Sequence, residues 1–225
     1  MERLFLKYND VAVRLACCVT SLEDFHLQAH EVLSHHELEK YDSFKVESGR
    51  IEYLLGRYSA KRAYLNLIDK NVAYNEIDIR NGIFEQPYIV GEADFDVSIS
   101  HSQNIGGAIV FDRAFPMGFD LEVIDEAKVK TIQVSVSDDE LEHMDGDYES
   151  NITAIWCMKE ALSKAIRTGL TVPLDLLKIS NMKRSGKFLE CRFENFSQYK
   201  AIAEIVGTYA MSIVYPQQLT VGDVI

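Results

Sequence analysis

The segment SHHELEKY, residues 34–41, opens on a serine that is followed three residues later by a glutamate. Ser34 and Glu37 have the spacing of a capping box, in which the two side chains bond free backbone N–H groups at the start of a helix. The pattern Ser-x-x-Glu-Leu-Glu returns in SDDELE, residues 137–142. A long stretch of helical spacing with a central lysine follows each copy, RYSAKRAY and WCMKEALSK. We interpret the echo as an internal repeat; the alternative is two unrelated helix caps.

Segments of alternating polarity surround these helices and predict short strands. FDVSISH (95–101), GGAIVF (106–111) and MGFDLEV (117–123) are expected to form a meander, and KFLECRF and YAMSIVY give strands in the last third. The predicted fold class is α+β, with two pseudo-symmetric α+β subdomains, residues 1–111 and 112–225. Each subdomain is expected to hold a small, mainly antiparallel sheet and a long helix, with the site in the cleft between them.

Composition limits the classes of function. The 225 residues are 47% hydrophobic, enough for a sizeable core, and the formal net charge of −12 argues against nucleic-acid binding. The four cysteines show no metal-binding spacing, so we expect reduced thiols. The start, MERLFLKYND, lacks the apolar region of a signal peptide, and no apolar run has the length of a membrane span. We therefore expect a cytoplasmic protein with no membrane and no nucleic-acid partner.

The strand MGFDLEV carries two carboxylates on one face. Asp120 and Glu122 are two residues apart, so their Cα atoms lie roughly 6.6 Å apart on the same side of the strand. Carboxylates at this spacing suit one hard cation with oxygen ligands at about 2.1 Å. Gly118 is expected to leave room for a ligand beside the backbone. The alternative is a strand with a solvated acidic face.

The segment WCMKEALSKAIRTGL, residues 156–170, predicts a helix with one apolar and one polar face. Glu160 and Lys164 stand one turn apart, which is also the spacing of an ordinary surface ion pair. The only tryptophan, Trp156, falls on the polar face, where a core does not need it. The polar face as a whole holds Trp156, Lys159, Glu160, Ser163, Lys164 and Arg167.

The segment SISHS, residues 98–102, places a histidine between hydroxyls at a strand end. Ser100, His101 and Ser102 fit a phosphate site, and a structural hydrogen-bonding histidine is the alternative. The chain has no P-loop, no HExxH and no GxSxG motif. A serine hydrolase of the nucleophile-elbow type is therefore not expected.

The order ISHS, GFDLE and WCMKEALSKA resembles the signature of the 4'-phosphopantetheinyl transferases over about residues 30–175. The two similar halves in one chain are similar to the surfactin-type branch of that family. The resemblance implies transfer of the phosphopantetheine arm of coenzyme A to a serine of an apo acyl or peptidyl carrier protein, with Mg²⁺ as cofactor. Adenosine 3',5'-bisphosphate is the implied by-product.

The resemblance also implies roles for individual residues. Asp120, Glu122 and Glu160 would hold the metal. Glu160, or a water that it orients, would accept the serine proton, Lys164 would steady the diphosphate, and His101 completes the implied catalytic set. By motif match, Ser100 and His101 contact the coenzyme A phosphates, and the other expected coenzyme A residues of these segments are Gln86, Pro87, Lys159 and Lys164. The nearby cations Lys40, Arg50, Arg57 and Lys61 are expected to add to this binding; the alternative is that they are solvated helix charges.

Two positions depart from the family pattern. Glu85-Gln86-Pro87 stands where Gly-Lys-Pro is frequent, and Glu37 stands where a basic residue is frequent. Both departures weaken the expected grip on the 3'-phosphate. They keep open a second hypothesis, that the chain is a non-catalytic protein that binds coenzyme A or a carrier. A metal-dependent phosphohydrolase using Asp120 and Glu122 is the third hypothesis.

The partner is expected to be a small acidic carrier protein, which an acidic chain can attract only through a local patch. The stretch AKVKTI, residues 127–132, is the candidate for that patch. We expect a monomer, because each half can cover the exposed face of the other.

Overall fold

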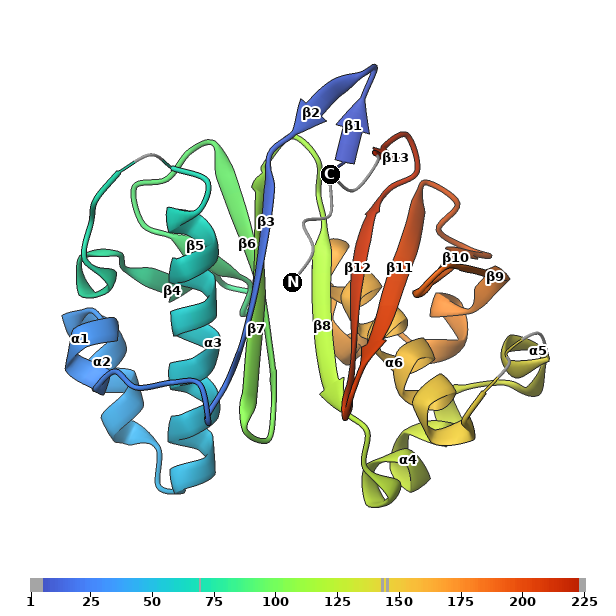
Figure 1. Ribbon diagram of the computed structural model, residues 1–225, viewed down its shortest axis with the longest axis horizontal. Helices are drawn as coiled ribbons and strands as arrows, with labels where there is room; N and C mark the ends of the chain where they lie inside the picture. Colours follow the sequence, from blue (N-terminus) through green and yellow to red (C-terminus); the bar gives the residue numbers. More distant parts are fainter. Residues whose placement is uncertain (1–5, 69, 143, 145, 223–225) are drawn as a thin grey trace. The chain divides into compact units, whose positions relative to one another are not determined.

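A computed structural model describes residues 6–68, 70–142, 144 and 146–222 (Figure 1). Contacts divide the chain into two compact units, Met1–Phe115 with Leu219–Ile225, and Pro116–Gln218. The contact boundary therefore lies between Phe115 and Pro116, and the tail belongs to the first unit. The expected halves at 111/112 remain a prediction, and their outermost residues fall outside the described part of the chain.

The first unit begins and ends with strands that pair with each other. Its elements are β1 (Leu6–Tyr8), β2 (Val11–Val13), β3 (Leu15–Ser21), α1 (Ala29–Val32), α2 (His35–Ser43), α3 (Glu47–Leu65), the 3-10 helix η1 (Tyr74–Glu76), β4 (Ile79–Asn81), β5 (Pro87–Ile89), β6 (Phe95–Ser102), β7 (Ile105–Asp112) and β13 (Thr220–Val221). Antiparallel pairing gives the sheets β13-β1-β2, β3-β7-β6 and β4-β5.

Helix α3 packs against the sheet β3-β7-β6 (Figure 1). A side chain at Gly106 of β7 would stand 2.6 Å from the backbone nitrogen of Gly56, so glycine permits the close approach of helix and strand. Ala60 and Ala63 of α3 share a buried apolar cluster with Val110 of β7. The small helix residues and the glycine together let the helix lie close to the sheet.

The second unit carries one larger sheet. Its elements are β8 (Gly118–Val123), α4 (Glu126–Ile132), η2 (Gln133–Ser135), α5 (Asp138–Leu141), α6 (Tyr148–Ala165), η3 (Gly169–Thr171), η4 (Leu174–Leu177), β9 (Ile179–Ser185), β10 (Phe188–Phe193), β11 (Tyr199–Val206) and β12 (Tyr209–Pro216). The strand order is β8-β12-β11-β10-β9, and each neighbouring pair is antiparallel. The expected α+β fold class is confirmed.

Helix α6 lies on this sheet and supplies most of the second core (Figure 1). Ile155, Met158 and Leu162 of α6 are fully buried in it, as their helical spacing predicts. The expected meander is wrong in one respect, because β8 pairs with β12 and not with β7. No helix in the described part of the chain is long and apolar enough to cross a membrane.

Both predicted capping boxes are present. Ser34 precedes α2 and exchanges bonds with Glu37, and Ser137 precedes α5 and pairs with Glu140 in the same way. Each glutamate is buried, with exposed fractions of 0% for Glu37 and 4% for Glu140. The repeated motif therefore places one buried carboxylate in each unit.

Candidate active site

The site is built where β8 passes beneath α6. Gly118, Asp120 and Glu122 share the face of β8 that is turned toward the helix, because alternate residues of a strand point the same way. A Cβ atom at Gly118 would lie 1.9 Å from the carbonyl oxygen of Ala161. The expectation that Gly118 leaves room for a ligand is therefore wrong, because the backbone of α6 fills that space.

Two lysines compensate the charges of the β8 carboxylates. Lys164 Nζ of α6 lies 2.8 Å from Asp120 Oδ1, and Lys128 Nζ of α4 lies 3.0 Å from Glu122 Oε2. Asp120 is only 5% exposed. These ion pairs join β8 to both helices, and they show that the acidic pair is not a freely solvated face.

Glu160 shares the electrostatic environment of the two β8 carboxylates. The pKa of Glu160 is raised to about 7, chiefly by burial and next by the charge of Asp120, while Lys164 opposes the shift. The charge of Glu122 acts in the same direction as that of Asp120. The charges of the two β8 carboxylates therefore both act on the protonation of Glu160.

The donor set fits a hard divalent cation, although it is not a preformed cage. Among the described residues, no three His, Cys, Asp or Glu side chains stand ready to hold a metal ion. Mg²⁺ is usually held by one or two carboxylates together with waters and substrate phosphates, so a three-residue cage is not required. Asp120, Glu122 and Glu160 offer only oxygen ligands, and the negative charges of Asp120 and Glu122, which add to the effect of burial on the pKa of Glu160, are charges that a cation would offset.

The structure gives Lys159 a role other than the one expected. Its side chain is buried with an exposed fraction of 1%, and its Nζ lies 2.8 Å from Glu140 Oε2 and 2.6 Å from the carbonyl oxygen of Ser135. The expectation that Lys159 contacts coenzyme A is therefore corrected to a structural role. Trp156 does not lie on a purely polar surface, because it packs against the buried apolar cluster that Val129 of α4 forms with Ile152 of α6.

Lys61 and Arg57 of α3 are corrected in the same way. Lys61 is 0% exposed, forms an ion pair with Glu37 and donates to the carbonyl oxygen of Val32 at 2.7 Å. Arg57 is 7% exposed and donates to Asn81 Oδ1 at 2.9 Å. Neither side chain is available to a ligand in this arrangement, so both belong to the core of the first unit.

The buried lysines form matching networks in the two units. Lys61 bonds the carbonyl two residues before Ser34, and Lys159 bonds the carbonyl two residues before Ser137. Each lysine also pairs with the buried capping-box glutamate. The lysine centred in each long helix was the available sequence signal, but nothing local marks a charged side chain as buried.

The serine and histidine of β6 lie on opposite faces of their strand. Ser100 is buried, and His101 is exposed with its Nδ1 3.4 Å from Glu52 Oε2 of α3. His101 and Ile99 share the face that meets Gly56 of α3. Only His101 of the two presents its side chain on the surface.

The other expected coenzyme A residues lie on helices α2 and α3 and on the β4–β5 hairpin. Lys40 stacks on the ring of Phe44 at 5.4 Å, and Arg50 Nε donates to the backbone of the same residue at 3.1 Å. Gln86 closes the β4–β5 turn, where its Oε1 accepts from the backbone N–H of a neighbour, and Pro87 begins β5. Lys40 and Arg50 retain exposed surface, whereas Gln86 serves the turn.

Lys128 was not among the expected site residues, although its ion pair with Glu122 places it there. The available signal was its position in AKVKTI, six residues after Glu122. A short separation in the sequence does not reveal which way the side chain of a lysine in the following helix points. The structure adds Lys128 to the site as a second cation.

Comparison with known proteins finds a family match in the second unit. The family model of the 4'-phosphopantetheinyl transferase superfamily matches residues 116–214, which contain β8 and α6. A holo-[acyl-carrier-protein] synthase of Staphylococcus carnosus is 34% identical over 84 residues, covering 35% of this chain and 72% of that protein. The corresponding protein of Staphylococcus aureus (strain JH9) is 35% identical over 78 residues, covering 32% and 66%. The chain belongs to the 4'-phosphopantetheinyl transferase superfamily.

Two solved structures of that kind are similar in part. The structure of a holo-(acyl-carrier-protein) synthase from Bacillus anthracis in complex with CoA (3',5'-ADP) has a TM-score of 0.38 and 22% identity, covering 49% of this chain and 97% of that one. A holo-[acyl-carrier-protein] synthase from Neisseria meningitidis has a TM-score of 0.37 and 17% identity, covering 44% and 96%. Membership in the surfactin-type branch remains a prediction.

Proposed function

We propose that the chain transfers the 4'-phosphopantetheine arm of coenzyme A to a serine of an apo acyl or peptidyl carrier protein, with Mg²⁺ as cofactor. The observation that supports the proposal is that the charges of Asp120, Glu122 and Lys164 all act on Glu160, within the segment that matches the superfamily. Coenzyme A is the substrate and adenosine 3',5'-bisphosphate the leaving group. The family relationship supports an enzyme; the metal and the carrier are the parts proposed here.

The chemistry asks for charge compensation and one base. The serine oxygen of the carrier bonds to the phosphorus next to the pantetheine arm, and the bond from that phosphorus to the bridging oxygen of the diphosphate breaks. Such a transfer gains most from positioning and from offsetting negative charge. A bound Mg²⁺ supplies that compensation. Asp120, Glu122 and Glu160 would hold the cation.

Glu160 is suited to take the serine proton. Serine is a poor nucleophile at neutral pH, so a carboxylate base in the same charged environment as Asp120 suits this step. Lys164, which pairs with Asp120, places a positive charge beside the same group. We assign base function to Glu160 and charge compensation to Lys164.

We propose that His101, Ser100, Lys40 and Arg50 of the first unit bind the phosphates of coenzyme A. Lys40 and Arg50 present cationic groups at the surface of α2 and α3. Arg57, Lys61 and Lys159 are not part of this proposal because they are buried in ion-pair networks. A cytoplasmic location and a monomeric state are retained as predictions.

The test is a mass-shift assay with coenzyme A, Mg²⁺ and a panel of apo carrier proteins. The wild-type chain should add one phosphopantetheine arm to at least one carrier. Asp120→Asn and Glu160→Gln should lower the rate at least a hundredfold, and Glu194→Gln, an exposed carboxylate change in the same unit, should not. Full rate in both site variants would remove the proposed roles.

The other hypotheses give different results in the same assay. Coenzyme A binding without any modified carrier would favour the non-catalytic protein, which the Gln86 departure kept open. Release of phosphate from simple esters without a carrier would favour the phosphohydrolase. Either result contradicts the proposed transfer.

A further inference from the structure

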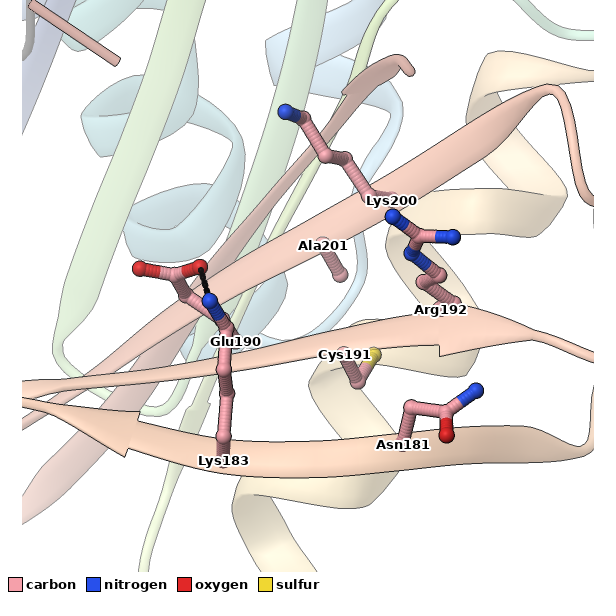
Figure 2. A pocket seen from close by; sticks show the side chains of 7 residues that line it. All are labelled: Asn181, Lys183, Glu190, Cys191, Arg192, Lys200 and Ala201. Carbon is pink, nitrogen blue, oxygen red and sulfur yellow. Dashed lines mark ion pairs between the residues drawn. The ribbon is translucent and has the colours of Figure 1, made fainter. Parts of the chain in front are cut away.

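The five-stranded sheet carries a second charged site, away from the carboxylates of β8. A pocket of about 390 Å³ lies over β9, β10 and β11 (Figure 2). Cys191 and Ala201 belong to the core under α6, so their neighbours along each strand point to the opposite face. The pocket is lined by Asn181, Lys183, Glu190, Cys191, Arg192, Lys200 and Ala201.

The charges in this pocket are not balanced. Lys183 Nζ lies 3.1 Å from Glu190 Oε2, which leaves Arg192 and Lys200 as two positive charges in excess. Within the described part of the chain, no carboxylate lies within ion-pair distance of either one. The whole chain has a formal charge of −12, so a local positive excess stands out.

Arg192 and Lys200 also occupy directly opposed positions. They are Cα partners in the register of β10 and β11. Like charges that face each other across two antiparallel strands destabilise the pair. Lys200 is held close to the protein, with its ammonium 5.2 Å from the centre of the Tyr215 ring. Burial lowers the pKa of Lys200; the charge of Glu190 opposes this shift, and the positive charges of Arg192 and Lys183 add to it.

A bulge in β9 supplies a neutral donor to the same pocket. Two residues, Asn181 and Met182, stand opposite the single residue Cys191, because the register shifts between Glu190 and Arg192. Asn181 has a φ of 52°, in the left-handed region. Such bulges redirect side chains, and Met182 still packs on the core while Asn181 is exposed in the pocket.

We propose that this pocket binds the phosphate group of a small molecule, with Arg192 and Lys200 offsetting its charge and Asn181 donating a hydrogen bond. Two excess positive charges match a phosphate dianion, and the planar guanidinium suits two of its oxygens. The pocket volume lies in the range of small-molecule sites. The ligand relieves the repulsion between the opposed cations. The site lies on the face of the sheet opposite to Asp120 and is separate from the proposed transfer site.

The test is an amide NMR titration of the full chain with inorganic phosphate at constant ionic strength. The amides of residues 181, 192 and 200 should shift in a saturable way. The variant R192Q/K200Q should bind at least tenfold more weakly, and Lys45→Gln, an exposed lysine change in the first unit, should bind like wild type. Acetate at the same ionic strength should not reproduce the shifts.

A second titration with glycerol phosphate distinguishes an organic phosphate ester from inorganic phosphate as the ligand. Tighter binding than inorganic phosphate supports an organic phosphate ester as ligand, and equal binding supports recognition of the phosphate group itself. Phosphate should also raise the melting temperature of wild type but not of R192Q/K200Q, whose own melting temperature should be equal or higher because the repulsion is gone.

Three outcomes would overturn the proposal. The first is the absence of saturable shifts in wild type, and the second is identical shifts in R192Q/K200Q. The third is a large loss of the transfer rate in R192Q/K200Q, because the proposal predicts a rate within twofold of wild type. A large loss would place the pocket in the transfer site and end its separate role, whereas failure of the transfer reaction in wild type would leave phosphate binding intact.

Discussion

Glu160 is the residue whose behaviour should change most when a metal binds. Its pKa is raised from 4.5 to about 7, chiefly by burial and next by the charge of Asp120. The folded protein therefore holds this proton more tightly than the unfolded chain. That contribution to stability is complete below the unfolded pKa and is lost as the pH rises from about 4.5 to about 7.

A cation beside Asp120 should reverse this shift. We expect Mg²⁺ with coenzyme A to lower the pKa of Glu160 by at least one unit, because a nearby positive charge favours the carboxylate. Carbon-13 NMR of the glutamate side chains measures the titration, and Glu160→Gln identifies the signal by its loss. An unchanged titration with the metal present would argue that Glu160 does not meet the ion.

Gly118 tests the close approach of strand and helix. The change Gly118→Ala puts a methyl group 1.9 Å from the carbonyl oxygen of Ala161, and neither backbone can yield cheaply. We expect a loss of about 2–3 kcal/mol in the free energy of unfolding. Urea denaturation measures it, and Gly49→Ala, which meets only the side chain of Phe44, should cost less. Equal stability of wild type and Gly118→Ala would mean that α6 lies farther from β8.

At the level of elements, each long helix is tied to a short one by a buried lysine. Lys159 joins α6 to the start of α5 through Glu140, which also accepts a hydrogen bond from the backbone of Ile179. Removing one partner of a buried pair leaves the other uncompensated. The network therefore fixes the end of α6 that carries Glu160.

The change Lys159→Met should destabilise the protein strongly. We expect a loss of about 3 kcal/mol, because Glu140 would remain buried without its cation. The matched change Lys130→Met, in an exposed pair, should cost less than about 1 kcal/mol. Urea denaturation of both variants measures the two losses in the free energy of unfolding. A normal stability with weakened coenzyme A binding would restore Lys159 to the substrate site.

Local sequence patterns predicted the elements better than their partners. Alternation located β6 and helical spacing located α6, since both patterns lie within one element. The pairing of β8 with β12 joins residues about ninety positions apart, and nothing in GFDLEV marks its partner. The helical wheel placed Lys159 on a polar face, but its buried partner Glu140 comes from a different element.

The candidate site was predictable to a similar degree. Asp120, Glu122 and Glu160 came from motifs, and the structure brings them into one electrostatic environment. Lys128 was missed as a site residue because its direction depends on how α4 follows β8. The space beside Gly118 was misjudged because the sequence does not show which helix crosses the strand.

For the whole molecule, the charge of −12 constrains how an acidic carrier can dock. The exposed Lys130 of α4 lies in the segment proposed for docking, with 67% of its side chain exposed. Lys130→Glu should raise the KM for the carrier severalfold and leave the KM for coenzyme A unchanged, with a smaller effect at high salt. Steady-state kinetics with Lys45→Glu as control measures this; equal carrier KM values for both variants would move docking elsewhere.

The central claim is that carboxylates of β8 and α6 share one divalent cation. An EPR titration of Mn²⁺ in the presence of coenzyme A tests it most directly, since free Mn²⁺ is measured without any turnover. The account predicts one Mn²⁺ per chain, displaced by Mg²⁺, with affinity at least tenfold weaker in Asp120→Asn and in Glu160→Gln and unchanged in Glu194→Gln. Saturable binding of equal strength in all four proteins, or no binding in wild type, would contradict it.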